Sequence, residues 1–360
     1  MRTSPTRRPV VPALMAPLAS VALLLGCGME HGSLPSEPAL GIAADVVGRD
    51  AFAWSEPVWL GPVVNSPARD FRPVLSTEGR RLYFHSDRDG GLGGHDFWVS
   101  RRAGINCPWE APVNLGPPLN TDTHDGDIAF TPDMRVVFYS SDGHGGEGRG
   151  DILISRRADP ADDFAWEQPV NLGQHVNTAA HESMPWYVPN EAGGTLYFER
   201  SLAAMGEDSE IYKVRITRDG QTRGPAVLVP ELNAPPPLAA TAPAVRADGR
   251  ELIFTSGGRP GSVGRADLWV STRRSVNDAW SAPRNLGRPV NTEFPEVAAT
   301  FSHDGRTLFF NAGQQRGGLG LQDMWMSTRG PSGDDDEDGD YDGDDRGRCI
   351  DDEHDDDDGN

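Results

Sequence analysis

Acidic residues recur at one position of a repeated sequence unit, and they are the clearest candidates in this chain for binding or catalysis. Each stands eight residues before a turn, and one of five repeated units has Ala240 there instead. The four acids are Asp70, Asp125, Glu182 and Glu296. If the units surround an axis, these carboxylates meet at a channel mouth, where like charges favour a bound cation, basic peptide or sugar. The alternative is structural, with each acid capping a turn through nearby backbone N–H groups.

The C-terminal segment, residues 331–360, holds a second concentration of carboxylates. From Asp334 to Asn360, 16 of 27 residues are Asp or Glu. Alternate acids with Gly343 after the third are typical of the opening of a calcium loop, where oxygens converge around a sharp turn. These acids are Asp338, Asp340, Asp342 and Asp344. The twelfth position is Cys349, which excludes an EF-hand. We expect Ca²⁺ here; the alternative is a solvated acidic tail that attracts divalent ions loosely.

Composition argues against several classes of function. The formal net charge of -21 disfavours nucleic acid, whose phosphates require a basic surface. The chain has no Gly-x-Ser-x-Gly, His-Glu-x-x-His or Cys-x-x-Cys motif. Its single lysine, Lys213, lies in a strand-like segment and not in a phosphate loop. We therefore expect neither nucleic acid nor nucleotide as a ligand.

The N-terminal residues predict export. Residues 1–26 combine early arginines with an apolar, proline-interrupted run, as in a signal peptide. The run ends Leu24-Leu25-Gly26-Cys27, which resembles the lipobox of bacterial lipoproteins. On that resemblance Cys27 carries lipid and anchors the chain in a bilayer; the alternative is an ordinary cleavable signal. Residues 27–50 are polar and predict a flexible tether. Cys107 and Cys349 either pair in the oxidising compartment or remain thiols.

Residues 51–330 contain one sequence unit repeated five times. An Asn marks the same point of each unit and recurs every 55 to 58 residues, at positions 65, 120, 177, 233 and 291. Four units begin with Trp-x-x-Pro, at Trp54, Trp109, Trp166 and Trp280. The unit between Trp166 and Trp280 has a degenerate Gly224-Pro225 copy followed by three prolines. Such regular spacing predicts a repeat architecture in which neighbouring units share a core.

Each unit predicts short antiparallel strands. A turn leads into an apolar run such as Leu82-Tyr83-Phe84, then a Gly-rich loop in most units, and then an acid that opens a second run such as Asp96-Phe97-Trp98. These second acids occur in all five units, so we assign them to turns of the fold. With 42 Gly and 30 Pro, long helices are disfavoured. A small sheet of this kind cannot bury both of its faces by itself. Radial packing against neighbouring sheets buries them, as in a propeller.

The repeated unit resembles the WD40-like PD40 repeats of TolB-type β-propellers. The residues that carry the resemblance are the Trp-x-x-Pro-x-Asn-Leu-Gly stretch, the Asp-Gly turn before Leu-Tyr/Phe-Phe, and the Asp-(Ile/Leu/Met)-Trp strand. It extends over about 280 residues and implies four-stranded blades, an envelope location and binding without catalysis. The tail resembles one thrombospondin type 3 repeat.

These observations together predict an all-β, five-bladed propeller in which the N-terminal strand completes the last blade. We expect a lipid-anchored envelope protein, at the outer membrane and facing periplasm or cell surface, that binds a protein, peptide or glycan without catalysis. The alternative is a propeller glycoside hydrolase or lyase that uses channel-face carboxylates. It rests on analogy between folds.

Overall fold

The computed structural model describes residues 53–330 apart from 203–207, 234, 236–237 and 314–315. The signal peptide, Cys27, the tether and the acidic tail with its proposed calcium ligands lie outside the described residues. Within the described residues all regular elements are strands, and no helix is long and apolar enough to cross a membrane.

Twenty strands form five antiparallel sheets of four strands each. Blade 1 contains β2 (Asp70–Leu75), β3 (Arg81–Ser86), β4 (Asp96–Arg101) and β5 (Val113–Asn114). Blade 2 contains β6 (Asp125–Phe130), β7 (Val136–Ser141), β8 (Asp151–Arg156) and β9 (Val170–Asn171). Blade 3 contains β10 (His181–Asn190), β11 (Gly193–Ser201), β12 (Glu210–Thr217) and β13 (Val227–Leu228). Blade 4 contains β14 (Thr241–Val245), β15 (Glu251–Ser256), β16 (Asp267–Thr272) and β17 (Arg284–Asn285). Blade 5 contains β18 (Glu296–Phe301), β19 (Thr307–Ala312), β20 (Asp323–Thr328) and β1 (Val58–Trp59).

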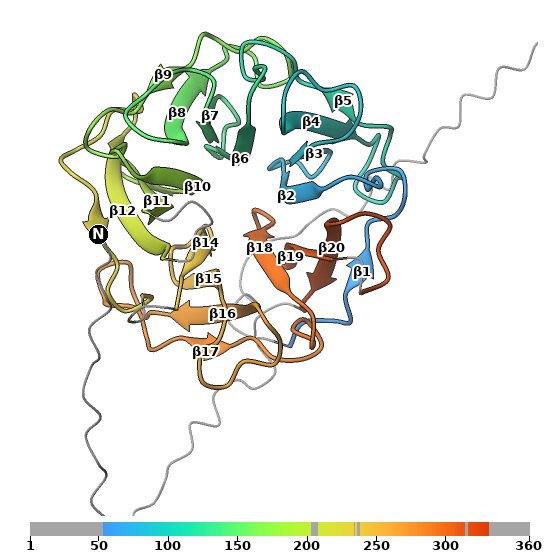
Figure 1. Cartoon of the computed structure of the whole chain (residues 1–360), viewed down its shortest axis with the longest axis vertical. Coiled ribbons are helices and arrows are strands. Elements are labelled where there is room, and N and C mark those ends of the chain that lie inside the picture. Colours follow the sequence, from blue (N-terminus) through green and yellow to red (C-terminus); the bar gives the residue numbers. More distant parts are fainter. Residues whose placement is uncertain (1–52, 203–207, 234, 236–237, 314–315, 331–360) are drawn as a thin grey trace, which may run out of the picture. The chain divides into compact units, whose positions relative to one another are not determined.

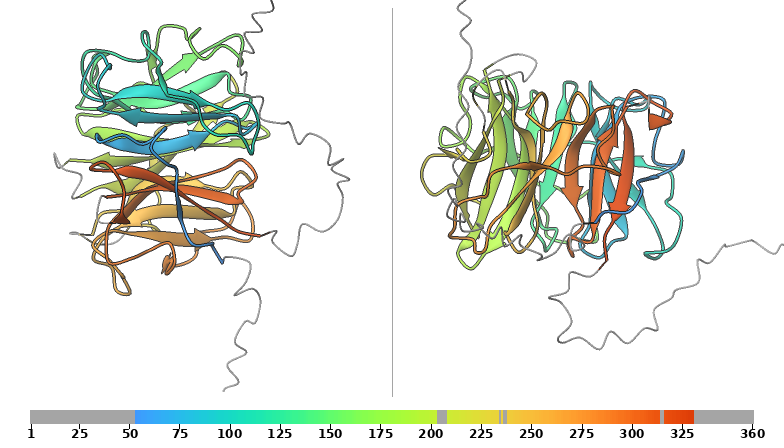
Figure 2. Two further views of the ribbon diagram at one scale, coloured as in Figure 1. Left: turned by 90° about the vertical axis from the view of Figure 1, so that its right-hand side faces the viewer. Right: turned by 90° about the horizontal axis from the view of Figure 1, so that it is seen from below.

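The blades surround a common axis, with β2, β6, β10, β14 and β18 nearest to it (Figure 1). The strands run between the two faces of the propeller (Figure 2). We call the face where these inner strands begin the start face, and the opposite one the end face. The third strand of a blade is antiparallel to the second, so it ends at the end face like the first.

The N-terminal strand completes the last blade, as the sequence predicted. β1 pairs with β20, with Trp59 opposite Trp325, and so covers an edge that would otherwise be open. The side chain of Asn65 accepts a hydrogen bond from the Met324 N–H at 2.7 Å and donates one to the Met324 carbonyl at 3.2 Å. The two ends of the propeller chain are therefore joined within one sheet.

The repeated Asn has the same role in every blade. Asn120, for example, accepts from the Phe97 N–H at 2.8 Å and donates to the Phe97 carbonyl at 3.0 Å. The Asn120 side chain thus makes the two hydrogen bonds that a neighbouring strand would make, at a point beyond the short outer strand. Asn177, Asn233 and Asn291 form the same pair of bonds with Ile152, Ile211 and Leu268. A buried amide satisfied in this way explains why the residue recurs.

The repeated Trp stacks against an arginine that follows the third strand. The Arg273 guanidinium lies 4.1 Å from the Trp280 ring centroid, and its Nε donates to the Gly249 carbonyl at 2.7 Å. The pairs Arg102–Trp109, Arg157–Trp166 and Arg329–Trp54 have the same stacking at 4.3 to 4.5 Å. Each pair combines a cation–π contact with a bond to a turn. Blade 3 lacks the tryptophan.

A β-bulge interrupts every inner strand within its first four residues. There the pairing with the second strand shifts, and the residue has a positive φ of 50 to 64° although none of the five is glycine. The five residues are Arg72, Asp127, Met184, Ala242 and Ala298. In four of them the N–H donates to a side chain on the second strand of the preceding blade, as Asp127 does to His85 Nδ1 at 3.1 Å. A bulge re-aims the side chain it carries, so these residues decide what lies near the axis.

Candidate active site

The four carboxylates that the sequence singled out are fully buried and bonded to nearby turns. Each accepts the backbone N–H of a Ser or Thr four residues earlier, at 2.5 to 3.0 Å, and also its hydroxyl. Asp70, Asp125, Glu182 and Glu296 are each 0% exposed. These contacts match the capping alternative, because no surface of these side chains is left for a ligand.

An arginine neutralises three of these four acids. Arg200 Nε lies 2.7 Å from Glu182 and its Nη2 donates to the Val176 carbonyl at 2.7 Å. Arg316 bonds Glu296 at 2.8 Å in the same way, and Arg88 pairs with Asp70. In blade 2 the corresponding side chain is His144, which contacts the Tyr139 ring. The four acids therefore fasten each inner strand to the loop that leads into it, and we do not assign ligand binding to them.

Replacing Glu296 by Gln should lower the free energy of unfolding by about 2 kcal/mol, because hydrogen bonds to a charged group are lost and Arg316 loses its partner. The Arg316 side chain is only 10% exposed. The matched control is Glu293→Gln, three residues away and 63% exposed, with an expected change within about 0.5 kcal/mol. Urea denaturation of both variants measures the difference. Equal stabilities would speak for a ligand-binding role instead.

A different pair of carboxylates lies near the axis. Asp127 occupies the bulge of β6 and Glu199 lies on β11, in the neighbouring blade. Asp127 Oδ2 accepts from the Ser140 hydroxyl at 3.1 Å and from the Met184 N–H at 3.4 Å. Its other oxygen, Oδ1, is buried and has no hydrogen-bond partner within the described part of the chain. A buried carboxylate oxygen without a donor requires an explanation, such as a water or a ligand group.

Glu199 is held from two sides. The Ser183 hydroxyl donates to its Oε1 at 2.8 Å and the Ala242 N–H to its Oε2 at 3.1 Å. These donors come from blades 3 and 4, so the carboxyl group lies where two inner strands approach. Glu199 is 7% exposed and Asp127 4%, which is small but more than the fully buried capping acids.

Arg72 crosses between blades beside this pair. Its Nη2 donates to the Pro185 carbonyl at 2.9 Å and to the Met184 carbonyl at 3.3 Å, both in blade 3. Arg72 is 0% exposed, and its pKa is lowered by burial, which the charges of Asp127 and Glu199 partly offset. It is thus a buried cation next to two carboxylates.

The two carboxylates have pKa values shifted in opposite directions. Burial raises the pKa of Glu199, and the nearby charge of Asp127 adds to this, against the hydrogen bond from Ser183. Burial acts the same way on Asp127, but His85 and Arg72 outweigh it and lower the pKa. Burial lowers the pKa of His85 itself to about 3, so Arg72 is the positive charge that persists at neutral pH. Asp127 is therefore ionised where Glu199 still retains its proton.

Sequence reasoning missed Asp127 and Glu199 because it searched for acids that recur. The bulge position reads Arg, Asp, Met, Ala, Ala around the five blades, and the facing second-strand position reads His, Ser, Glu, Thr, Asn. The sequence did contain a signal for these two residues, because each is charged at a repeat position where the other blades have different residues. A structural role tends to recur in every blade, whereas a role in a binding or catalytic site does not.

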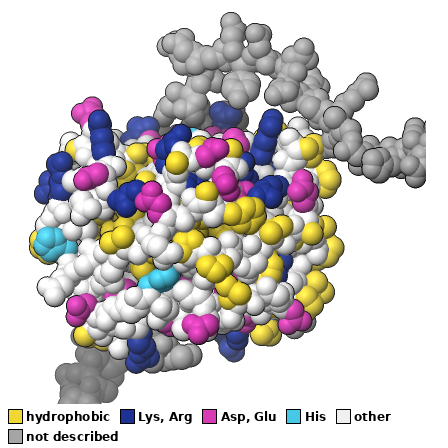
Figure 3. Space-filling view, turned by 90° about the horizontal axis from the view of Figure 1, so that it is seen from above, with side chains coloured by type: hydrophobic (Ala, Val, Ile, Leu, Met, Phe, Trp, Pro, Cys, Tyr) yellow, Lys and Arg dark blue, Asp and Glu magenta, His cyan; other side chains and the backbone are white. Residues whose placement is uncertain are grey.

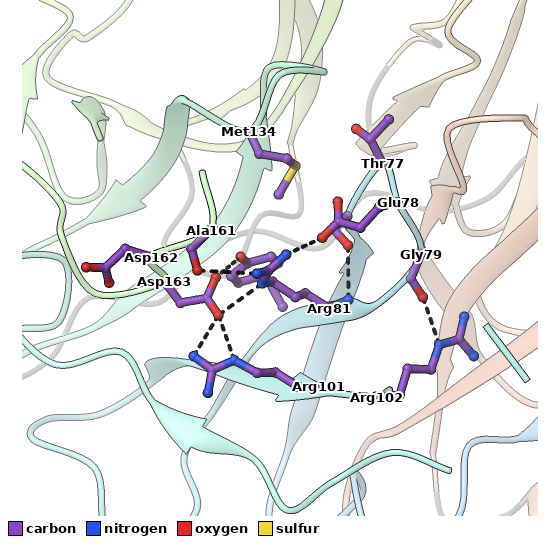
Figure 4. Close-up of polar contacts among 12 residues, drawn as sticks. Thr77, Glu78, Gly79, Arg81, Arg101, Arg102, Met134, Ala161, Asp162 and Asp163 are labelled. Carbon is purple, nitrogen blue, oxygen red and sulfur yellow. Dashed lines mark hydrogen bonds and ion pairs between the residues drawn. The ribbon is translucent and has the colours of Figure 1, made fainter. Parts of the chain in front are cut away.

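A second buried charge cluster joins blade 1 to the loop after β8 (Figure 4). Asp163 is 1% exposed and accepts from Arg101 Nε at 2.9 Å, Arg81 Nε at 3.2 Å and Arg157 Nη1 at 3.2 Å. The Tyr83 hydroxyl donates to it as well. Burial raises the pKa of Asp163, but Tyr83 and the arginines outweigh this and lower it. The arginines around Asp163 also bond to Glu78, to the Tyr83 hydroxyl and to backbone carbonyls, so we assign the cluster to stability.

Among the described residues, no group of three or more His, Cys, Asp or Glu is arranged to hold a metal ion. Three histidines do lie together at the blade 1–blade 2 junction, with His95 Nδ1 3.0 Å from His124 Nδ1 and the His85 ring 5.4 Å from that of His95. They form ring contacts and one mutual hydrogen bond. The aspartates expected to bind Ca²⁺, in the tail, lie outside the described residues.

Solved structures with this fold include glycoside hydrolases. A thermostable family-43 glycoside hydrolase has a TM-score of 0.52 at 13% identity, over 76% of this chain and 97% of that one. An endo-arabinase from Bacteroides thetaiotaomicron has a TM-score of 0.51 at 16% identity, over 76% and 98%. TolB from Acinetobacter baumannii has a TM-score of 0.43 at 11% identity, over 75% and 56%. No protein-family model and no curated protein sequence matches the chain.

These comparisons establish the five-bladed propeller fold. They also correct the expectation of a propeller that binds a partner without catalysis. That expectation came from the resemblance to TolB-type repeats, whereas solved structures with TM-scores above 0.5 include glycoside hydrolases.

Proposed function

We propose that this propeller hydrolyses a glycosidic bond near its start face, where the inner strands of blades 2 and 3 approach, with Glu199 as general acid and Asp127 as the ionised carboxylate. The observation that carries the proposal is the pair itself: two buried carboxyl groups from adjacent blades, in surroundings that shift their pKa values in opposite directions. Glycoside hydrolysis requires this division of roles, because one group protonates the leaving oxygen while the other activates water or attacks the sugar.

The chain supplies further groups that fit the proposal. Asp127 Oδ1 is buried and has no hydrogen-bond donor among the described residues, which leaves it as the acceptor for a water or a sugar hydroxyl. Arg72 keeps Asp127 ionised, and Ser183 with the Ala242 N–H orients Glu199. The fold supports the same reading by analogy with family-43 and family-62 enzymes.

The test is a panel of aryl glycosides and polysaccharides, with α-L-arabinofuranosides and arabinan first because they are the substrates named for the structural neighbours. We expect release of aglycone or sugar from at least one member, and nuclear magnetic resonance of the first-formed product to show a single anomer. No turnover across furanosides, pyranosides and uronides would reject the proposal.

For location, we propose that the chain is an exported lipoprotein anchored through Cys27, with Ca²⁺ bound at its acidic tail. The sequence carries this proposal, and one described residue supports export: Cys107 is disulfide-bonded, and disulfides persist in oxidising compartments. Replacement of Cys27 by Ser should move the protein from the membrane to the soluble fraction. Retention of a mature-sized variant in membranes would contradict the anchor.

A further inference from the structure

Blade 3 has a cation where the other four blades have tryptophan. The outer strand β13 begins at Val227, and the residue four positions before it is Arg223. Four positions before the other outer strands stand Trp54, Trp109, Trp166 and Trp280. In those blades the indole ring lies under the arginine that follows the third strand. Blade 3 has no ring to occupy this space.

A second replacement lies directly beside the first. Lys213 pairs with Val227 and also faces Tyr197 across the sheet. The residues at the same register in the other blades are all apolar, namely Val99, Ile154, Val270 and Met326. The only lysine of the chain thus replaces an aliphatic side chain, next to an arginine that replaces a tryptophan.

These replacements line an open cleft of about 730 Å³ on the end face, between blades 3 and 4. Its walls include the cations Lys213, Arg215, Arg223 and Arg273 and the exposed apolar side chains of Pro189 and Val276. Its lining residues come from blade 3 and from the loop after β16, and Figure 1 shows where these elements lie. A cleft of this volume accommodates a small ligand of one to three sugar rings.

Most of the cationic groups in the cleft lack a partner. Lys213, Arg215 and Arg223 make no side-chain hydrogen bond or ion pair with any described residue, whereas Arg273 is held by Gly249 and Trp280. Burial lowers the pKa of Lys213, and the like charge of Arg273 lowers it further, against the opposite effect of Glu231. A bound anion would relieve this repulsion.

This arrangement differs from the part of the surface that Figure 3 shows. On the side of the propeller shown in Figure 3, acidic and basic side chains lie among one another. A cluster of unpaired cations in a chain of net charge -21 is therefore a local feature of one blade. Its apolar walls favour a ligand with C–H faces as well as charge, which is the character of an acidic sugar.

We propose that the cleft of blade 3 binds an acidic oligosaccharide, whose carboxylate or sulfate groups pair with Lys213, Arg215 and Arg223 while a sugar ring packs against Pro189 and Val276. The cleft lies on the end face, whereas Asp127 and Glu199 lie toward the start face. The site is thus separate from the proposed hydrolytic centre, and neither proposal depends on the other.

The test is calorimetric titration of the full chain with trigalacturonate, a sulfated galactose oligomer and neutral galactotriose. We expect at least one acidic ligand to bind about tenfold or more tightly than galactotriose, with an affinity that falls as salt is added. The double variant Lys213→Gln/Arg215→Gln should lose about tenfold or more of that affinity. Arg223→Gln, at an exposed position, provides a second variant with an expected loss in the same direction.

The matched control is Arg135→Gln/Arg306→Gln, which removes the same charge from two exposed turn residues of other blades. It should bind as the parent does, and all variants should keep the parent's melting temperature. Equal binding of galactotriose and the acidic ligands would overturn the proposal, as would an equal loss in the control. Inorganic phosphate binding as tightly as the oligosaccharides would overturn it too, because the site would then recognise charge without the sugar.

Discussion

Glu199→Gln is expected to lower the rate of glycoside hydrolysis by about 10² to 10⁴-fold, the range for loss of a positioned general acid. The Gln side chain keeps a carbonyl oxygen to accept from Ser183 or Ala242, so the strand geometry should survive. Asp127→Asn should cause a loss in the same range, because the amide can neither activate water nor stabilise positive charge on the sugar. The exposed Glu293→Gln is the matched control.

The pH profile of kcat/KM tests the assignment of roles. Asp127 must be ionised, so activity is lost as pH falls through its pKa, which lies below the ordinary value of 3.8. Glu199 must be protonated, so activity is lost as pH rises through its pKa, which lies above the ordinary value of 4.5. The wild-type profile should be bell-shaped, and the residual activity of Glu199→Gln should lack the alkaline limb. Parent-level activity in either variant, with melting unchanged, would remove these residues from the mechanism.

Asp163→Asn is expected to lower the free energy of unfolding by about 3 to 5 kcal/mol, the usual cost of leaving a buried charge network without one partner. Arg157, whose side chain is fully buried, and Arg81 would lose their counter-charge, and Tyr83 would lose a strong acceptor. The adjacent Asp162→Asn is the control, since Asp162 is exposed and only caps the Phe164 N–H at 2.9 Å.

The same carboxylate should make stability depend on pH. Its pKa is lowered in the folded state, so its contribution is present above the unfolded value and is lost as pH falls through the folded one. Thermal melting of the parent should therefore decline below about pH 4, while Asp163→Asn, already without this contribution, should decline less. Equal stabilities of the Asp162 and Asp163 variants at neutral pH would contradict the structural role of this cluster.

The fold could be predicted from sequence because its contacts repeat. Asn120 bonds the two backbone groups of one residue, and the same local geometry arises wherever an Asn stands at that spacing. The surplus Trp54 segment at one end and the missing outer strand at the other predicted the closure, because an open edge is unfavourable. The second acids, such as Asp267, indeed accept turn N–H groups, as at Val263.

The candidate site could not be found in this way. Repetition directed attention to Asp70, Asp125, Glu182 and Glu296, and repetition is what a turn cap produces. The carboxylates near the axis are Asp127 and Glu199. Each occupies a position of the repeat at which the other four blades have no acidic residue. Their nearness to each other depends on the bulge in β6 and on the packing of blade 2 against blade 3.

The amino-acid sequence alone determined the number of blades, the strands, their closure and the residues that hold each turn, because all of these depend on contacts within one unit or between identical units. Only the tertiary structure decided which side chains meet between unlike blades. It placed Asp127 beside Arg72, gave Glu199 its partners in blades 3 and 4, and opened the cleft at Lys213 where blade 3 lacks tryptophan. Such contacts join residues that are far apart in the chain. No local sequence pattern therefore determines the charges around each side chain or the volume available to it.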